Sequence, residues 1–93
     1  MTLVWLARAL NDRDAQLDHI VQDNPPDAVS QGDHVTAQAD MLLQHPQMGH
    51  PGRKPGTREL VIIRPPFIVV YRIRGQPVEV LRLLHGARKW PRA

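Results

Sequence analysis

The sequence predicts an α+β fold in the order β-α-α-β-β-β, in which a small antiparallel sheet carries two packed helices on one face. Three observations predict this arrangement of layers. Apolar residues recur at helical spacing in the first half of the chain, β-branched and aromatic residues form three closely spaced runs in the second half, and one short strand-like run precedes the helices. The length of 93 residues favours a single domain over residues 1–93 with a thin core.

The first half of the chain contains the opening strand and both helices. TLVWL, residues 2–6, is strand-like, and from Ala7 to Asp23 apolar residues recur at helical spacing between acidic ones. The prolines of NPPDAV then interrupt the helix, because they disfavour helical geometry in the preceding residue while suiting the first turn of a new helix. A second apolar stripe from Ala28 to Leu42 predicts a helix that ends near QHP, and Gly32 within it costs about 1 kcal/mol relative to alanine.

The second half contains three strand-like runs. RELVIIR, PFIVVYRI and VEVLRLL are separated only by PP and RGQP, which is close enough to predict antiparallel hairpins. Neighbouring positions such as Val69 and Val70 are both apolar, so both faces of the strands carry apolar side chains. Two helices cover only one face of a sheet this size. Either the sheet bends around its own core, or a partner segment lies on the other face.

Charge is divided unequally along the chain. Residues 1–45 hold two cations and seven acids, whereas residues 46–93 hold ten cations and two acids, which gives net charges of −5 and +8. One interpretation is that the basic half binds an anionic partner. The other is that these cations are solvated strand residues with no target.

Several classes of site are not expected in this chain. It contains no cysteine, which excludes disulfides and thiolate metal sites and suits a reducing compartment. No basic segment precedes the first apolar residues, and no apolar run approaches the roughly 18 residues that a membrane span requires, so we expect a cytoplasmic protein. His45 and His50 are not joined by an acidic residue or a cysteine, so neither a metal site nor another cofactor is expected.

Four segments together resemble the RelE/ParE superfamily of toxins from bacterial type II toxin–antitoxin pairs. They are GRKPGTRELV, FIVVYRI, VLRLLHGARKWP and, between the two helices, DNPPDAV. The resemblance spans nearly the whole chain, and PGTREL and HGARKWP are its most specific parts. It implies a small α+β toxin that is neutralised by a co-expressed antitoxin, whose disordered segment folds on the toxin surface. Such a segment would cover the second apolar face of the sheet.

The superfamily divides into two mechanisms. RelE-like members are similar in cutting messenger RNA inside the ribosome, whereas ParE-like members bind DNA gyrase and trap it on cleaved DNA. The ribonucleases resemble one another in an arginine two residues into the strand motif that ends in VY, where this chain has Ile68. They also place a tyrosine after the final strand, where this chain has Trp90, which cannot act as an acid or base. Arg72 or Arg82 would replace the missing cation only by pointing into the same cavity.

These departures favour a ParE-like growth inhibitor that binds gyrase. The alternative is a RelE-like, ribosome-dependent messenger RNA endonuclease (mRNA interferase). A third possibility is a toxin fold that has lost its activity or acts on another target. The resemblance therefore leaves the enzymatic status open, with no chemistry if the chain is ParE-like and endoribonuclease activity if it is RelE-like.

The candidate target-binding residues lie in the loop before the hairpins and at the end of the last strand. They are Arg53, Lys54, Arg58, His85, Arg88, Lys89 and Trp90. In this architecture we expect the loop and the strand ends to lie close together and to form one concave basic patch. If the chain is a nuclease, the expected catalytic residues are Arg58, His85 and Arg88.

The loop GHPGRKPG, residues 49–56, has two interpretations. Its prolines and glycines stiffen and turn it so that Arg53 and Lys54 are held beside the sheet for an anionic target, or they only reverse the chain between helix and strand.

Four other residues also have a structural and a functional interpretation. Arg58 either ties the loop to the helix layer or contacts the target, and Trp90 either packs over the sheet edge or contacts the target. Glu59 is interpreted as a salt-bridge partner on the strand face rather than as a catalytic base, and Tyr71 as a core residue with its hydroxyl at the rim.

Overall fold

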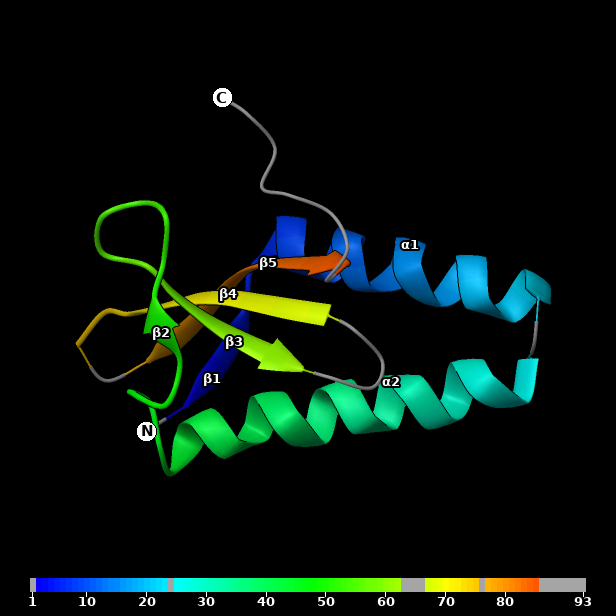
Figure 1. Ribbon diagram of the computed structural model, residues 1–93, viewed down its shortest axis with the longest axis horizontal. Coiled ribbons are helices and arrows are strands. Elements are labelled where there is room, and N and C mark those ends of the chain that lie inside the picture. The colour runs from blue at the N-terminus through cyan, green and yellow to red at the C-terminus, as the bar shows by residue number, and fades with distance from the viewer. Residues whose placement is uncertain (1, 24, 63–66, 76, 86–93) are drawn as a thin grey trace.

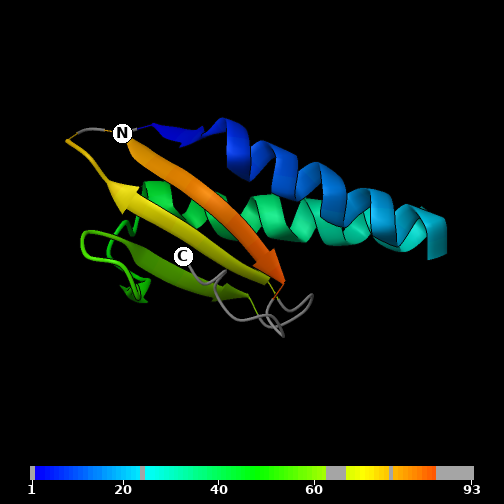
Figure 2. The same ribbon diagram turned by 90° about the horizontal axis from the view of Figure 1, so that it is seen from above.

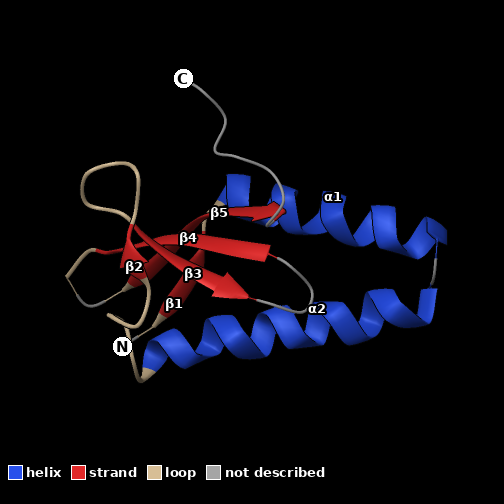
Figure 3. Cartoon of the chain, viewed as in Figure 1, coloured by secondary structure: helices blue, strands red, loops and turns tan. Residues whose placement is uncertain are grey.

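The computed structural model describes residues 2–23, 25–62, 67–75 and 77–85. Two helices pack against a five-stranded mixed sheet (Figures 1 and 3), which confirms the predicted α+β class. The elements in chain order are β1 (Leu3–Trp5), α1 (Ala7–Asp23), α2 (Pro25–Asp40), the short 3₁₀-helix η1 (Met41–Leu43), β2 (His50–Pro51), β3 (Arg58–Ile62), β4 (Phe67–Ile73) and β5 (Val78–His85). The strand order across the sheet is β1-β5-β4-β3-β2.

The two hairpins form as the short connections predict. β3 pairs with β4 and β4 with β5, both antiparallel, so that Leu60 lies beside Val69 and Val69 beside Leu83. A second helix does begin at the prolines, and α1 and α2 lie side by side against the sheet (Figures 1 and 2). Within the described residues, no helix is both long enough and apolar enough to cross a membrane.

The sheet departs from the prediction at both of its edges. β1 pairs with β5 in parallel, so the sheet is mixed rather than purely antiparallel. Nothing local in the sequence marks this pairing, because its two strands lie at opposite ends of the chain. At the other edge, His50 and Pro51 form the strand β2 inside the segment expected to be a loop. Pro51 lacks a backbone N–H, which an edge strand tolerates.

The core lies between the helices and one face of the sheet. Tyr71 is fully buried there, as predicted, between Arg58 on β3 and Val80 on β5. The cluster consists of Ala9, Val35, Leu42, Leu60, Ile62, Phe67, Val69, Tyr71, Val78, Val80 and Leu83, with Leu3 and Trp5 packed against it. The Arg13 guanidinium covers the Trp5 ring at 5.0 Å from its centroid.

Helix α1 completes the edge of β5 that β1 leaves uncovered. The chain turns into α1 after Leu6, whose N–H donates to the Val80 carbonyl. Beyond that point the Asp12 carboxylate accepts hydrogen bonds from the Leu83 N–H (3.0 Å), from Arg82 Nε (2.7 Å) and from Arg82 Nη2 (3.2 Å). Asp12 therefore takes the place of a strand neighbour, and its carboxylate raises the pKa of Arg82 further above its ordinary value.

Replacing Asp12 with alanine should lower the free energy of unfolding by about 2 kcal/mol, because the Leu83 N–H and the Arg82 guanidinium both lose a partly buried, charged acceptor. Urea denaturation measures this change. Asp14→Ala on the same helix is the matched control, since Asp14 is exposed and its removal should change stability by less than about 0.5 kcal/mol. Equal midpoints for the two variants would show that Asp12 does not support the β5 edge.

Candidate docking surface

The face of the sheet opposite the core, here called the second face, carries the residues that bear on function. It is formed by the cross-strand rows Val61–Ile68–Leu84 and Glu59–Val70–Arg82 and by the pair Arg72–Glu79. Part of this face is covered by the chain itself, because Val70 is fully buried and Glu59 is only 3% exposed. Glu59 Oε2 accepts a hydrogen bond from the Arg53 N–H of the loop between β2 and β3 (3.2 Å).

The row that contains Ile68 is apolar throughout. Ile68 lies between Val61 on β3 and Leu84 on β5, and cross-strand neighbours project from the same face of a sheet. Val61 is 53% exposed, whereas Leu84 is buried. The position at which the ribonucleases place an arginine is thus part of an apolar strip, which we call the apolar row and define as Val61, Ile68 and Leu84.

The two arginines considered as replacements for the missing cation are each bound to a carboxylate. Arg72 Nε donates to Glu79 Oε1 at 2.7 Å, and Arg82 is bound to Asp12 on α1. Arg82 does line a cavity, but Ile68 is not among the described residues that surround it. Neither arginine therefore supplies a positive charge at the apolar row in this arrangement.

The described candidate residues do not gather in one basic patch, contrary to the prediction. β3 and β5 both run antiparallel to β4 and therefore in the same direction, which places Arg58 at one end of the sheet and His85 at the other. Arg58 shares a row with Tyr71, His85 shares a row with Phe67, and four residues along a strand span about 13 Å. The His85 ring contacts the Phe67 ring edge-on, with centroids 5.8 Å apart.

Arg58 binds the loop that follows η1. Its Nη1 donates to the carbonyl oxygens of Gly49 (2.9 Å) and Gln47 (3.4 Å). Nearby, the Tyr71 hydroxyl donates to the Pro46 carbonyl (2.7 Å) and accepts from the Gly49 N–H (2.9 Å). These bonds support the structural interpretation of Arg58, which fixes the chain between the helices and the sheet.

Two further candidates, Arg53 and Lys54, lie on the loop between β2 and β3. The loop around Lys54 is held by hydrogen bonds, because the Lys54 carbonyl accepts from both the Thr57 N–H (3.2 Å) and the Thr57 hydroxyl (2.6 Å), and the Gly52 N–H donates to the Thr57 carbonyl (2.8 Å). The turn also uses the positive φ of Gly56, 78°, which favours glycine. Arg53 is exposed on this loop. The candidates Arg88, Lys89 and Trp90 lie outside the described residues.

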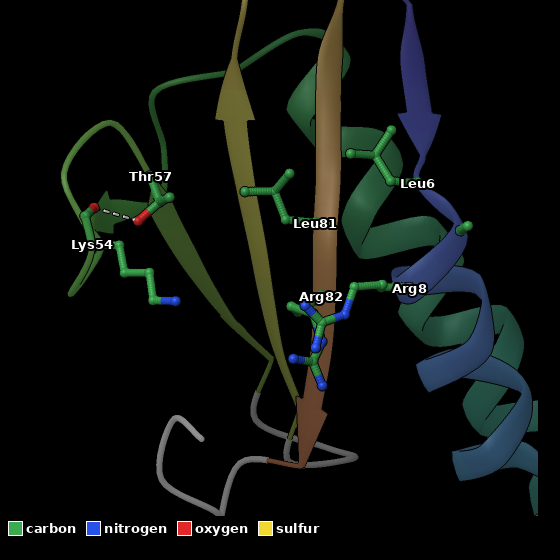
Figure 4. Close-up of a pocket in the computed structure, with 7 residues that line it drawn as sticks. Leu6, Arg8, Lys54, Thr57, Leu81 and Arg82 are labelled. Atoms are coloured by element: carbon green, nitrogen blue, oxygen red, sulfur yellow. Dashed lines mark hydrogen bonds between the residues drawn. The ribbon is translucent and has the colours of Figure 1, made fainter. Parts of the chain in front are cut away.

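Lys54 lies close to Arg8 and Arg82, two arginines that the sequence analysis did not group with it. Arg8 at the start of α1, Lys54 in the loop and Arg82 on β5 line one cavity on the second face (Figure 4). Local patterns contain no signal for this arrangement, because the three residues come from segments far apart in the chain. Local patterns also contain no signal for the contact between Asp12 on α1 and Arg82 on β5.

The Tyr71 hydroxyl should be harder to ionise in the folded protein. Burial raises its pKa above the ordinary value near 10, although the Gly49 N–H and the charge of Arg58 partly oppose this. The raised pKa favours the neutral phenol in the folded state, so its contribution to stability is complete below about pH 10 and is lost as the pH rises through the folded value. The chain has one tyrosine, so the near-ultraviolet tyrosinate absorbance reports Tyr71 alone. A titration midpoint equal to that in guanidinium would contradict the expectation.

Comparisons with known proteins identify toxins of type II toxin–antitoxin systems as relatives of this chain. Residues 3–90 match the family described as the ParE toxin of the type II toxin–antitoxin system, parDE. The protein named toxin Y4kP from Sinorhizobium fredii is 37% identical over 87 residues, which cover 94% of this chain and 90% of that relative. Toxin RelE2 from Caulobacter vibrioides is 34% identical over 86 residues, covering 92% of this chain and 96% of the relative.

A solved structure supports the same conclusion. The chromosomal ParDE toxin–antitoxin system from P. aeruginosa contains a chain that superimposes with a TM-score of 0.84 at 31% identity, covering 91% of this chain and 95% of that one. The family match covers nearly the whole chain, and the fold is shared over the same extent. The chain therefore belongs to the ParE toxin family of type II toxin–antitoxin systems, within the RelE/ParE superfamily.

Proposed function

We propose that this toxin arrests growth by docking onto DNA gyrase rather than by cleaving messenger RNA. The observation that carries the proposal is the apolar row of Val61, Ile68 and Leu84 on the second face. It occupies the place at which the ribonucleases of the superfamily present a cation. The exposed part of this row, chiefly Val61, suits a binding surface, because burying it against a partner contributes free energy without any chemistry.

A ribonuclease would need a different surface at this position. Cleavage next to a phosphate builds negative charge on its oxygens, and losing one preorganised donor typically lowers the rate on the order of 10²–10³-fold. Arg72 and Arg82 are held by Glu79 and Asp12, so neither compensates at the apolar row. The proposal also places the toxin in the cytoplasm, where gyrase acts on the chromosome.

The endonuclease is the second candidate because one relative carries the name RelE2. A single pair of assays separates the two functions. We expect the purified chain to raise the amount of gyrase–DNA cleavage complex in a supercoiling reaction and to leave ribosome-bound messenger RNA intact in a translating extract. Cleavage at defined codon positions, abolished by His85→Ala or Arg88→Ala, would refute gyrase docking and establish the nuclease. If neither gyrase trapping nor messenger RNA cleavage is observed, the chain has a toxin fold that is inactive or has another target.

An antitoxin is the expected partner of a toxin of this family. The basic second half of the chain and the exposed part of the second face suggest that its toxin-binding segment is rich in acidic and apolar residues and folds on binding. Such binding raises the apparent stability of the toxin by mass action.

A further inference from the structure

A cavity of about 310 Å³ opens on the second face between α1, the β2–β3 loop and β5. We call it the cationic pocket and define it by Arg8, Lys54 and Arg82 with Leu6 and Leu81. Figure 4 shows the Lys54 side chain extending from the loop toward Arg82, and Arg8 extending toward Arg82 from α1. Three separate elements thus bring cationic side chains to one place.

The pocket is preorganised for a negative charge. Arg82 is fixed by its two hydrogen bonds to Asp12, and the backbone of Lys54 is fixed by Thr57. Helix α1 begins beside the pocket with no acidic residue in its first turn, so the positive end of the helix dipole adds to the cations. None of the described residues that line the pocket is acidic, and Asp12 already pairs with Arg82, so an anionic ligand would interact chiefly with Arg8 and Lys54.

A bulge in β5 gives the same pocket an apolar wall. Tyr71 pairs with Val80 and Val70 pairs with Arg82, so Leu81 is the extra residue in the register between them. Neighbours in a regular strand point to opposite faces, but at a bulge the strand bends and a side chain is re-aimed. Leu81 and Arg82 therefore both line the pocket, with Leu6, which lies between β1 and α1, as a second apolar contact.

We propose that the cationic pocket binds an acidic side chain of the antitoxin together with an apolar side chain beside it. This inference rests on the proposed toxin function, which supplies the antitoxin. The apolar wall distinguishes such a peptide from a nucleic acid, whose phosphates would gain nothing from Leu6 and Leu81. The volume is at the low end for a binding pocket and fits one or two side chains rather than an extended polymer. The acid pairs with Arg8 and Lys54, and its apolar neighbour covers Leu81.

The test measures the affinity of the purified toxin for the product of the adjacent antitoxin gene by calorimetry. Arg8→Gln and Lys54→Gln should each weaken binding about tenfold, and the double variant about a hundredfold, with a weaker dependence on salt. Both residues are exposed, so thermal melting should be unchanged. Arg74→Gln is the matched control, because it removes an exposed arginine that does not line the pocket and should leave the affinity unchanged.

A second measurement identifies the acid. Each Asp or Glu of the antitoxin segment is changed to the corresponding amide, and the effect is measured with wild-type toxin and with Lys54→Gln. One position should lose most of its effect in the Lys54→Gln background, which shows that the two side chains interact.

The outcomes separate this inference from the proposed function. If the antitoxin binds wild-type toxin and the double variant equally well, the pocket is not its anchor, whereas gyrase docking is unaffected. If the pocket variants lose affinity for single-stranded RNA but not for the antitoxin, the pocket is a nucleic-acid site and the inference is wrong. The absence of any toxin–antitoxin complex would also overturn it. If the pocket variants lose antitoxin while the free chain leaves gyrase uninhibited, the inference stands and gyrase docking fails.

Discussion

Replacing Gly49 with alanine should destabilise the toxin by about 3 kcal/mol. A Cβ atom at this position would lie 2.6 Å from the Tyr71 hydroxyl oxygen, 2.7 Å from Tyr71 Cε1 and 2.9 Å from the Glu59 carbonyl oxygen. Tyr71 is fully buried and its hydroxyl is held by Pro46 and Gly49, so the ring has little freedom to withdraw. Overpacking costs about 1–3 kcal/mol, and the Gly49 N–H to Tyr71 bond adds about 1 kcal/mol when it is lost.

Thermal and urea denaturation measure this effect. For a chain of this length, about 3 kcal/mol corresponds to a fall in Tm of roughly 12–24 °C. Gly75→Ala is the control, because a Cβ there meets nothing within 4 Å and the cost arises only from the positive φ of 67°, about 1–2 kcal/mol. A Gly49→Ala variant no less stable than Gly75→Ala would show that the loop after η1 adapts freely to Tyr71.

Replacing Val61 with glutamine should sharply weaken growth arrest without unfolding the protein. Val61 is 53% exposed in the apolar row, so the free toxin tolerates a polar side chain there. In a docked complex the amide would lose its water and the apolar contact would be lost. Together these cost about 2 kcal/mol, or roughly a thirtyfold loss of affinity for the target.

Val4→Gln is the matched control for Val61→Gln. Val4 is a strand valine with 41% exposure, and β1 is separated from β3 by β5 and β4. Induction of each variant at matched protein levels, followed by colony counts and the gyrase cleavage assay, distinguishes them. We expect Val61→Gln to lose potency and Val4→Gln to keep it. Equal potency of Val61→Gln and the wild type would remove the apolar row from the docking surface.

The sequence predicted those parts of the fold that depend on neighbouring residues. The hairpins follow from short connections, and the second helix follows from the prolines in its first turn. The pairing of β1 with β5, the contact of Asp12 with Leu83 and the pocket around Arg82 depend on residues far apart in the chain, and no spacing rule marks them. The motif that ends in VY identifies Ile68 as the position of the missing arginine, but only the strand register shows that its neighbours Val61 and Leu84 are also apolar.

The prediction of one basic patch failed for a geometric reason. β3 and β5 lie on either side of β4 and run in the same direction, so the start of β3 lies at the same end of the sheet as the start of β5. The end of β5, which carries His85, lies at the opposite end. Arg58 and His85 are therefore far apart. The bulge at Leu81 leaves only an ambiguous trace, because the alternation of VEVLRLL breaks at the adjacent apolar residues Val80 and Leu81, and a strand that is apolar on both faces gives the same pattern.

The pairing of β1 with β5 has a consequence for when the toxin becomes active during synthesis. Leu3 of the first strand lies beside Val78 of the last, so the sheet is incomplete until β5 has emerged from the ribosome. Contacts between distant segments form late because the intervening chain must first be closed into a loop. The apolar row and the cationic pocket both include residues of β5, so neither surface exists on a nascent chain that lacks it. Translation of the last strand thus sets the earliest moment at which both surfaces can be complete.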